Sequence, residues 1–450
     1  RNLFTVSGEV ISKAADEEKD SVYAQYYDFS QPVSKIAGHR VLAIDRGERE
    51  GFLKVSVTLD SVKAANVITS ETLLSGNSPC TETVREAGED AYTRLIYPSV
   101  EREIRSSLTE KAAADAIKVF SQNLKELLLQ PPVKGKVALG LDPGYRTGCK
   151  VAVVDATGRV LDTGVAYITH SERKQQEAKE LIASFIKKYG VEIIAIGNGT
   201  ASRETEDFMK RIHLPDGCKV WTVSEDGASI YSASEVARKE FPDEDVTVRG
   251  AVSIGRRLMD PLAELVKIDP KNLGIGQYQH DVDQALLKEK LDNTVESCVN
   301  AVGVNLNTAS PYLLSYVAGI GPALAENIVT YRAANGGFRS RTELKKVPRL
   351  GAKAFEQCAG FLRIRGAENP LDASAVHPES YGIVDMMAKS LGVSTMELVG
   401  NAQLCSKIRA EEFVSDAAGL PTINDILKEL AKPGLDPREA ASEFAFADDI

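Results

Sequence analysis

The sequence predicts a multidomain protein that is mainly helical and contains one α/β domain. Its 450 residues give room for about three domains, and its 43% hydrophobic and 26% charged residues are typical of a folded globular chain. Hydrophobic residues recur at helical spacing along most of the chain, whereas residues 136–168 read as extended runs separated by glycine turns. Two similar glycine turns, near residues 319 and 349, interrupt a later helical stretch.

Residues 1–131 are expected to form a mostly helical scaffold. The stretch 102–129 has hydrophobic residues at helical spacing, and the Gln-Pro-Pro sequence at 130–132 ends it. The stretch 39–57 instead predicts two short extended runs around a glycine-containing turn. No candidate catalytic or ligand-binding group is evident in this region.

Residues 132–262 are expected to form the α/β domain. Three extended runs lie within residues 136–168, and the residues from Asp155 to Gly158 predict a hairpin turn between the second and the third. The elements expected next are a helix ending at Gly190, a strand over 191–199, a helix from about Ser202, a strand over 218–225 and a helix from about Ser229. Three antiparallel strands followed by alternating helices and strands indicate an RNase H-like domain.

The rest of the chain is expected to be helical, in two parts of opposite charge. Residues 263–366 form a helical segment with the glycine turns, and residues 367–450 form an acidic helical domain. Residues 311–366 hold nine Lys or Arg and three Asp or Glu, a net charge of +6, whereas residues 367–450 hold six and fifteen, a net charge of −9. A basic island in a chain of net charge −10 indicates a localised polyanion site. In the tail we expect helix starts at Ser394 and Thr422 and breaks at Gly392, Pro421 and Pro433-Gly434.

The two glycine turns align at an offset of thirty residues, with VAGIG at 317–321 matching VPRLG at 347–351. Glycine permits a positive φ and a close approach of the backbone to a ligand. The first N–H groups of the following helix lack internal partners, so a phosphate can accept hydrogen bonds from them. Such a turn between two helices is the helix-hairpin-helix motif, which contacts the nucleic-acid backbone and is largely blind to base sequence.

The second copy departs from the motif, because Arg349 stands where the first copy has Gly319. This copy is expected either to hold phosphate weakly or to complete the paired domain structurally. Basic residues around both turns are expected to flank one phosphate track. The predicted contacts are Gly319, Gly321, Arg339, Arg341, Lys345, Lys346, Arg349, Gly351 and Lys353. The alternative is a plain helical hairpin whose glycines serve tight packing.

The α/β domain has acidic residues where nucleases of the RNase H class hold two metal ions. Asp142 follows the first strand, but the next buried strand ends in Asn198, a poorer ligand for a hard cation. Glu225, its neighbour Asp226 and Asp260 are candidate partners of Asp142. The carboxylate set is incomplete, so we expect a catalytically degenerate domain without a cofactor. An Asp before a Gly turn also begins the phosphate site of actin-like ATPases, but the duplicated loop that this reading needs is missing.

Several stretches together resemble the Tex family of bacterial transcription accessory proteins: GLDPGYRTGCKVAVVD, GNGTASRETEDF, SEDGASIYSASEVARKEFP and the distinctive GQYQHDVDQALL. The resemblance extends over nearly the whole chain. It implies a YqgF-type RNase H-like domain, regarded as degenerate in the family, in a nucleic-acid-binding factor that works with the transcription machinery. Family members normally have further N-terminal helices and a C-terminal OB-fold RNA-binding domain, so we expect this chain to match the central part of their length.

Three functions remain open from the sequence. The first is a non-enzymatic transcription accessory factor that binds RNA or DNA through phosphates. The second is a nuclease or resolvase that requires Mg²⁺ and uses Asp142, Glu225 and Asp260. The third is a protein-binding scaffold, with the acidic tail and helical surfaces as docking sites.

Other classes of protein are disfavoured by composition. Six dispersed cysteines without a C-x-x-C pair, and five dispersed histidines, predict neither a disulfide framework nor a metal site and suit a reducing cytoplasm. No stretch approaches the roughly 18 apolar residues of a membrane helix, and the first residues lack the apolar core of a signal peptide. We therefore expect a cytoplasmic protein without a membrane or small-molecule partner.

Overall fold

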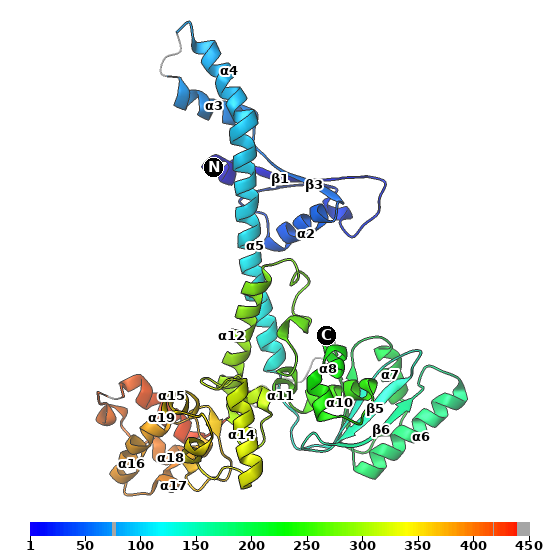
Figure 1. Ribbon diagram of the computed structural model, residues 1–450, viewed down its shortest axis with the longest axis vertical. Coiled ribbons are helices and arrows are strands. Elements are labelled where there is room, and N and C mark those ends of the chain that lie inside the picture. The colour runs from blue at the N-terminus through cyan, green and yellow to red at the C-terminus, as the bar shows by residue number, and fades with distance from the viewer. Residues whose placement is uncertain (74–77, 417, 439–450) are drawn as a thin grey trace. The chain divides into compact units, whose positions relative to one another are not determined.

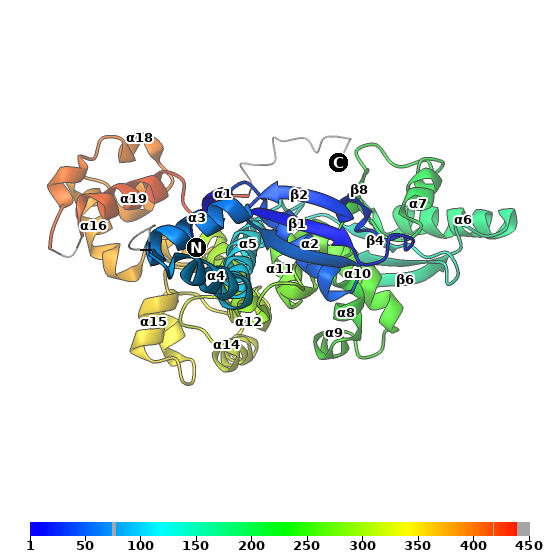
Figure 2. The same ribbon diagram turned by 90° about the horizontal axis from the view of Figure 1, so that it is seen from above.

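The computed structural model describes residues 1–73, 78–416 and 418–438 (Figure 1). These residues form two compact units. The first comprises Arg1–Asn123 together with Ile275–Lys290, and the second comprises Leu124–Gly274 together with the described residues from Leu291 onward. Figure 2 shows the same elements from above. Within the described ranges, no helix combines the length and the apolar character needed to cross a bilayer.

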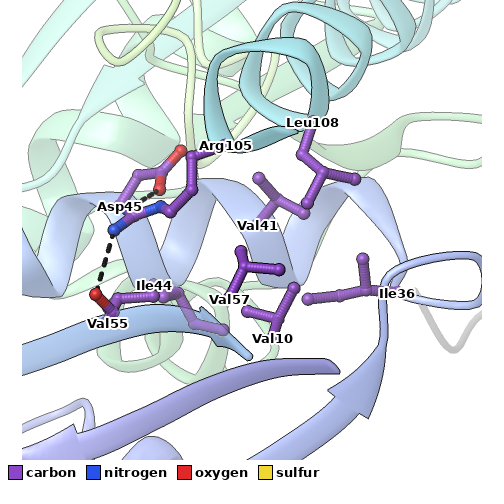
Figure 3. A pocket seen from close by; sticks show the side chains of 9 residues that line it. All are labelled: Val10, Ile36, Val41, Ile44, Asp45, Val55, Val57, Arg105 and Leu108. Carbon is purple, nitrogen blue, oxygen red and sulfur yellow. Dashed lines mark hydrogen bonds and ion pairs between the residues drawn. The ribbon is translucent and has the colours of Figure 1, made fainter. Parts of the chain in front are cut away.

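The first unit is built around a three-stranded antiparallel sheet. Its elements are α1 (Asn2–Ser7), β1 (Glu9–Ala14), β2 (Asp28–Pro32), α2 (Gly38–Arg49), β3 (Leu53–Thr58), α3 (Ser61–Thr72), α4 (Thr81–Ala91) and α5 (Tyr97–Leu128), which continues into the second unit. The strand order is β2-β1-β3. A cavity of about 10 Å³ lies between the sheet, α2 and α5, and the Arg105 guanidinium donates to Asp45 at its edge (Figure 3).

One expectation for this unit is wrong in part. Residues 39–57 were predicted as two extended runs, but the first half is helical and only β3 is extended. The hydrophobic run Val41–Ile44 is buried on α2, and a short apolar run does not by itself distinguish a helix from a strand. Gly51, with φ 80°, makes the turn, whereas Gly47 lies inside the helix where a Cβ would meet Leu53 at 2.6 Å.

The distinctive GQYQHDV stretch packs within the first unit, although the predicted boundaries grouped it with the later helices. Asp281 accepts hydrogen bonds from Arg46, at 2.9 Å from Nε, and from Arg49. Asn123 donates to the carbonyl of Ile275 at 2.7 Å. At Gly276 a Cβ would lie 2.0 Å from the Phe120 ring, so the backbone of this stretch lies directly against α5.

The α/β domain of the second unit has the predicted strand order. Its strands are β4 (Ala138–Asp142), β5 (Cys149–Val154), β6 (Val160–Ala166), β7 (Ile193–Gly197) and β8 (Lys219–Val223). They form one sheet in the order β6-β5-β4-β7-β8. The first three strands are antiparallel, and β7 and β8 continue parallel to β4. The hairpin between β5 and β6 turns where predicted, since Asp155 Oδ1 accepts from the Thr157 N–H at 2.8 Å and Gly158 has φ 85°.

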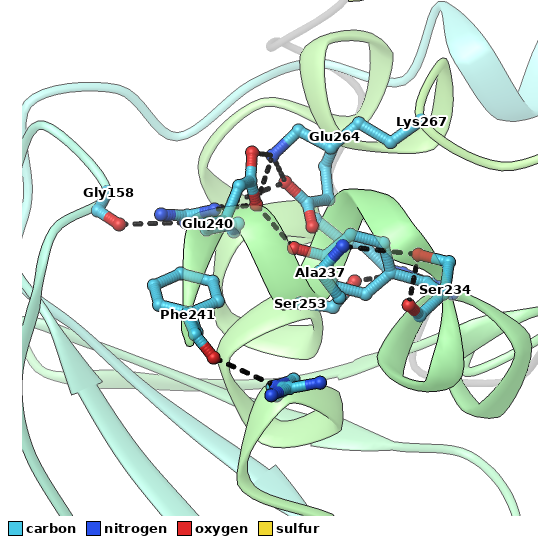
Figure 4. A network of polar contacts seen from close by, with 12 residues as sticks. Gly158, Ser234, Ala237, Glu240, Phe241, Ser253, Glu264 and Lys267 are labelled. Atoms are coloured by element: carbon cyan, nitrogen blue, oxygen red, sulfur yellow. Dashed lines mark hydrogen bonds and ion pairs between the residues drawn. The ribbon is translucent and has the colours of Figure 1, made fainter. Parts of the chain in front are cut away.

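Helices cover both faces of this sheet. They are α6 (Glu172–Tyr189), α7 (Ser202–Met209), α8 (Ala228–Ala233), α9 (Glu235–Glu240), α10 (Val246–Met259) and α11 (Pro261–Leu265). Residues of α6 and α7 pack on one face, and α10 packs on the other. Gly190 ends α6 with φ 62°, as predicted. A polar network joins α9 to the residues after α11, because Lys267 Nζ lies 2.9 Å from both Glu240 and Glu264 (Figure 4).

The remaining described residues of the second unit are mainly helical. The helices are α12 (Gln284–Val302), which begins in the first unit, α13 (Pro311–Leu314), α14 (Pro322–Asn335), α15 (Ala352–Cys358), α16 (Tyr381–Ser390), α17 (Thr395–Leu398), α18 (Ala402–Cys405) and α19 (Leu420–Ala431). Two short strands, β9 (Val304–Asn305) and β10 (Leu362–Arg363), pair in parallel. Ser394 caps α17 as predicted. The prediction at Thr422 is wrong: Gly419 is the N-cap of α19, and Pro421 lies in the first turn, where a missing N–H costs nothing.

Candidate nucleic-acid interface and acidic site

The first helix-hairpin-helix turn connects α13 to α14. Gly319 has φ 79°, and the Ile320 N–H donates to the Val317 carbonyl at 2.9 Å. Gly321 is the N-cap of α14, and no side chain caps this helix. Gly321 has an ordinary φ of −91°, and a Cβ there would meet nothing within 4 Å. Neither backbone conformation nor packing therefore requires glycine at 321, and the start of α14 is open to the outside.

The second turn has the same backbone shape. Arg349 adopts φ 66°, and the Leu350 N–H donates to Val347 at 3.2 Å. Gly351 caps α15 with φ −78° and ψ 174°, close to the values of Gly321, and it also has open space around it. A non-glycine residue in the left-handed region costs about 1–2 kcal/mol, so Arg349 holds this shape at some expense of stability.

The two hairpins pack directly against each other. A Cβ at Gly319 would lie 2.7 Å from Cβ of Gln357 and 3.3 Å from the carbonyl of Ala354, so the first turn contacts α15 through backbone. Asn327 of α14 donates to the Pro348 carbonyl of the second turn at 3.0 Å. Each turn thus contacts the helix that follows the other, and the pair forms one structural unit.

Five of the six predicted basic contacts lie on the surface of this unit. These are Arg339, Lys345, Lys346, Arg349 and Lys353. In the described parts of the chain, none of them forms a salt bridge with a carboxylate. Lys345 lies 4.7 Å from the centre of the Phe355 ring, a cation–π contact that leaves its charge uncompensated. The positive charge of this surface is therefore available to a polyanion.

Arg341 departs from the prediction that it contacts phosphate, because its side chain is 1% exposed. Its guanidinium donates to the carbonyls of residues 362, 371, 374 and 376 and to the Tyr381 hydroxyl. Its backbone N–H donates to Asp372 at 3.0 Å. Arg341 therefore joins the tandem hairpins to the helices that follow them and cannot reach a ligand on the surface.

Of the four candidate carboxylates in the α/β domain, the structure brings together Asp142 and Glu225, whereas Asp226 lies against Gly274, where a Cβ would be 2.2 Å from its Oδ2. Asp142 ends β4, and Glu225 follows β8. Burial first, and then the charge of Glu225, raises the pKa of Asp142 to about 6. Asn198 at the end of β7 accepts a hydrogen bond from the Glu225 N–H at 3.1 Å. Asn198 thus positions the turn that carries Glu225.

Asp260 is placed elsewhere. It caps α11 by accepting from the Ala263 N–H at 3.2 Å, and it pairs with Arg438 at 2.7 Å. Asp142 faces α10 at Gly250, where a Cβ would lie 2.7 Å from its Oδ2. Ten residues of helix, about 15 Å, separate Gly250 from Asp260. Asp260 therefore does not complete a carboxylate set with Asp142.

Sequence reasoning missed Arg257, which lies on α10 with 4% exposure. Its Nη1 donates to the carbonyls of Ser224 and Asp226, both at 2.8 Å, and so fixes the turn that presents Glu225. Arg257 lies seven residues after Gly250 and therefore on the same face of α10, the face that contacts Asp142. This spacing could have indicated Arg257 from the sequence. Arg257 thus places a cation close to Asp142 and Glu225, and no group of three or more potential metal ligands occurs in the described ranges.

The acid pair gives a prediction for stability against pH. The folded-state pKa of Asp142, about 6, is above its ordinary 3.8, so the protonated form stabilises the fold and this contribution is lost as pH rises through 6. We expect Asp142→Asn to raise the free energy of unfolding at pH 8 by up to about 3 kcal/mol, and to have little effect near pH 4. Urea denaturation followed by fluorescence of Trp221, the single tryptophan, measures this.

Asp162 provides the control for this measurement. A hydrogen bond from Tyr189 lowers the pKa of Asp162, so its ionised form stabilises the fold above the ordinary pKa. Asp162→Asn should therefore lower stability at pH 8, opposite in sign to Asp142→Asn. A loss of stability in both variants would contradict the raised pKa of Asp142.

Family models match most of the chain. Residues 1–120 match a Tex central region-like model, residues 136–259 a Tex protein YqgF-like domain, residues 299–363 a helix-hairpin-helix motif and residues 369–438 an HHH domain. The sequence predicts only an acidic helical domain for residues 367–450, and the last match identifies most of this region as an HHH domain. Two glycines could have indicated this domain from the sequence. Gly400, with φ 82°, precedes Asn401, the N-cap of α18, and Gly419 is the N-cap of α19.

Relatives align over nearly the whole chain. The chain is 49% identical to the transcriptional accessory protein Tex of Neisseria gonorrhoeae, over 96% of this chain and 58% of that protein. It is 46% identical to protein tex of Bordetella pertussis, over 99% of this chain and 58% of that protein. It is 38% identical to the human S1 RNA-binding domain-containing protein 1, over 89% of this chain and 46% of that protein. The chain thus spans about half the length of these relatives.

Proposed function

Because this chain belongs to the Tex family of transcription accessory proteins, we propose that it binds nucleic acid through the sugar–phosphate backbone, using the tandem hairpins. The turn at Gly321 would receive a phosphate at the start of α14. The exposed basic side chains around both turns would neutralise neighbouring phosphates. Transcription machinery as a partner and a cytoplasmic location are part of the same proposal.

One observation supports this proposal most directly: glycine at 321 is not needed by the fold. Ser, Asp or Asn would cap α14 better, by roughly a few tenths of a kcal/mol, and each would fit the open space. A glycine leaves the helix N-terminus free for an anion, where N–H groups and the helix dipole favour negative charge. The unpaired cations Lys345, Lys346, Arg349 and Lys353 favour a polyanion at the same surface.

We further propose that the α/β domain does not catalyse hydrolysis. Asn198 and Arg257 support this, because the first removes a carboxylate and the second introduces a cation beside Asp142 and Glu225. A nuclease would need Mg²⁺ or Mn²⁺ and would lose activity in Asp142→Asn. Incubation of labelled RNA and DNA with Mn²⁺ and each protein is therefore the direct check on this part of the proposal.

The binding proposal is tested by titrating labelled single- and double-stranded RNA and DNA at two salt concentrations. With about four phosphate contacts, affinity should fall roughly 100-fold between about 50 and about 200 mM salt. Gly321→Glu should weaken binding at least about tenfold, or about 1.4 kcal/mol, because it places a carboxylate where the phosphate would lie. Arg349→Gly relaxes the turn and removes one cation, so the salt slope should fall by about one.

The matched control is Gly382→Glu. Gly382 also has open space at its Cβ position, and it lies on α16, outside both turns in the sequence. It makes the same charge change in the same protein and should leave the affinity close to that of the parent. Equal affinities for Gly321→Glu and Gly382→Glu would show that the turns serve packing only.

A further inference from the structure

A groove of about 400 Å³ lies between α3 and α4 in the first unit. From α3, Val62, Ala65 and Ile68 line it, at the spacing of one helix face. The opposite wall is formed by Glu89 of α4 and by Tyr92 of the π-helical segment Tyr92–Ile96. A volume of this size is within the range of ligand sites in proteins.

The walls of this groove expose hydrophobic surface. Ala64 is the only buried residue of α3, and neither α4 nor the π-helical segment buries any residue. Val62, which lines the groove, is 65% exposed. Helices in a folded domain normally bury an apolar stripe against another element. Within the described ranges, Tyr92 packs against the core of the first unit, whereas Val62 on the α3 wall stays exposed.

The two walls are held in contact, so the groove exists before any partner binds. A Cβ at Gly88 would lie 2.9 Å from Ile68 Cγ2, which shows that the backbone of α4 lies directly against α3 at this point. The π-helical segment shifts the register of the second wall and directs Tyr92 to the groove. Such segments occur frequently at functional sites.

Arg85 and Glu89 both line the groove, and α4 as a whole carries four carboxylates against one arginine. Arg85 pairs with Glu82 at 2.6 Å, and Arg94 pairs with Asp90. Within the described ranges, Glu86 and Glu89 of α4 have no such cation. Phosphate is repelled by this arrangement, so the groove is not part of the proposed nucleic-acid interface. A ligand that offers a cation beside an apolar surface is favoured.

We propose that this groove binds an amphipathic helix of a partner protein, with an apolar stripe against α3 and a Lys or Arg beside Glu89. Helix-in-groove recognition uses anchors at helical spacing, which matches the stripe that α3 presents. α3 has twelve residues, about 18 Å, so about three turns of the partner helix would be covered. A third helix in this position would complete a helical bundle.

The probe for this proposal is a labelled synthetic helix of about four turns with a leucine stripe and lysine flanks, titrated into the 450-residue chain by fluorescence anisotropy. Glu89→Lys should weaken binding at least about tenfold. Glu86→Lys is the matched control, since it makes the same change one turn away on α4 without lining the groove. Ala65→Phe fills the groove and should also weaken binding, whereas Val67→Phe, on the exposed side of α3, should not.

The outcomes separate this groove from the nucleic-acid interface. The proposal is supported if Glu89→Lys and Ala65→Phe lose the peptide while their controls keep it and all four bind nucleic acid like the parent. It is overturned if the parent does not bind the lysine-flanked helix. It is equally overturned if Glu89→Lys and Glu86→Lys lose the same affinity, because binding would then follow net charge alone.

Discussion

Replacing Arg341 with methionine is expected to destabilise the tandem hairpins by about 3–5 kcal/mol, the largest effect on stability that we predict. The guanidinium donates to four carbonyls and one hydroxyl in a fully buried position. Removing it leaves these acceptors buried without a donor, and Asp372, which is 3% exposed, loses a neighbouring cation. Methionine retains much of the volume, so the loss comes from polar contacts rather than from a cavity.

Two probes resolve this effect by domain. Far-UV circular dichroism follows the helices, whereas the single tryptophan, Trp221 on β8, follows the α/β domain. In Arg341→Met, part of the helical circular dichroism signal should be lost at a temperature roughly 10 °C lower than in the parent. The melting temperature followed by Trp221 fluorescence should not change. Arg339→Met is the control, since Arg339 is exposed two residues away and should change stability by less than about 0.5 kcal/mol. Identical melting of the two variants would contradict the buried role.

Gly140→Ala is expected to destabilise the α/β domain by about 3 kcal/mol or more. A Cβ at this position of β4 would lie 2.1 Å from the Ala251 carbonyl and 2.8 Å from the Gly255 nitrogen. Both contacts are with the backbone of α10, which cannot yield by rotating a side chain, so the whole helix must move away from the sheet. Inserting even one carbon into a packed core typically costs about 1–3 kcal/mol, and backbone contacts place this case at the upper end.

The circular dichroism and Trp221 signals should respond to Gly140→Ala in the opposite way to Arg341→Met. The unfolding transition followed by Trp221 fluorescence should shift to a lower denaturant concentration. The transition followed by circular dichroism of the hairpin helices should not change. Gly382→Ala, with open space around its Cβ, is the control and should be nearly neutral. If Gly140→Ala unfolds like the control, α10 does not lie against β4 as described. The variant should also disturb the acid pair, because α10 contacts Asp142 and carries Arg257.

Much of the α/β domain could be predicted from sequence because its signals are local. Hydrophobic runs of strand length, a helix with period 3.6 and Gly190 at its end are all readable within about twenty residues. The two glycine turns are local in the same sense, and Arg349 adopts the left-handed conformation of Gly319 despite its side chain. Such features fix the backbone without reference to distant residues.

The side chains that were misplaced depend on partners far along the sequence. Arg341 resembles its basic neighbours until residues 362–376 fold over it, some twenty to thirty-five positions later. Asp260 looks like a candidate ligand until Arg438, 178 residues away, pairs with it. Residue type and spacing cannot indicate which of several like charges becomes buried, because burial is decided by the packing of separate segments.

The ion cluster at Asp260 has a mechanical consequence. Arg438, 2% exposed, bridges Asp260 and Asp436, and Lys134 lies 3.0 Å from Asp436. These ion pairs connect Asp436 and Arg438, near the end of the described chain, to Lys134 at the start and Asp260 at the end of the α/β domain. Tension applied to the hairpin region by a nucleic acid would reach the sheet through this clamp as well as along the chain. The loss of Arg438 would remove this non-covalent connection.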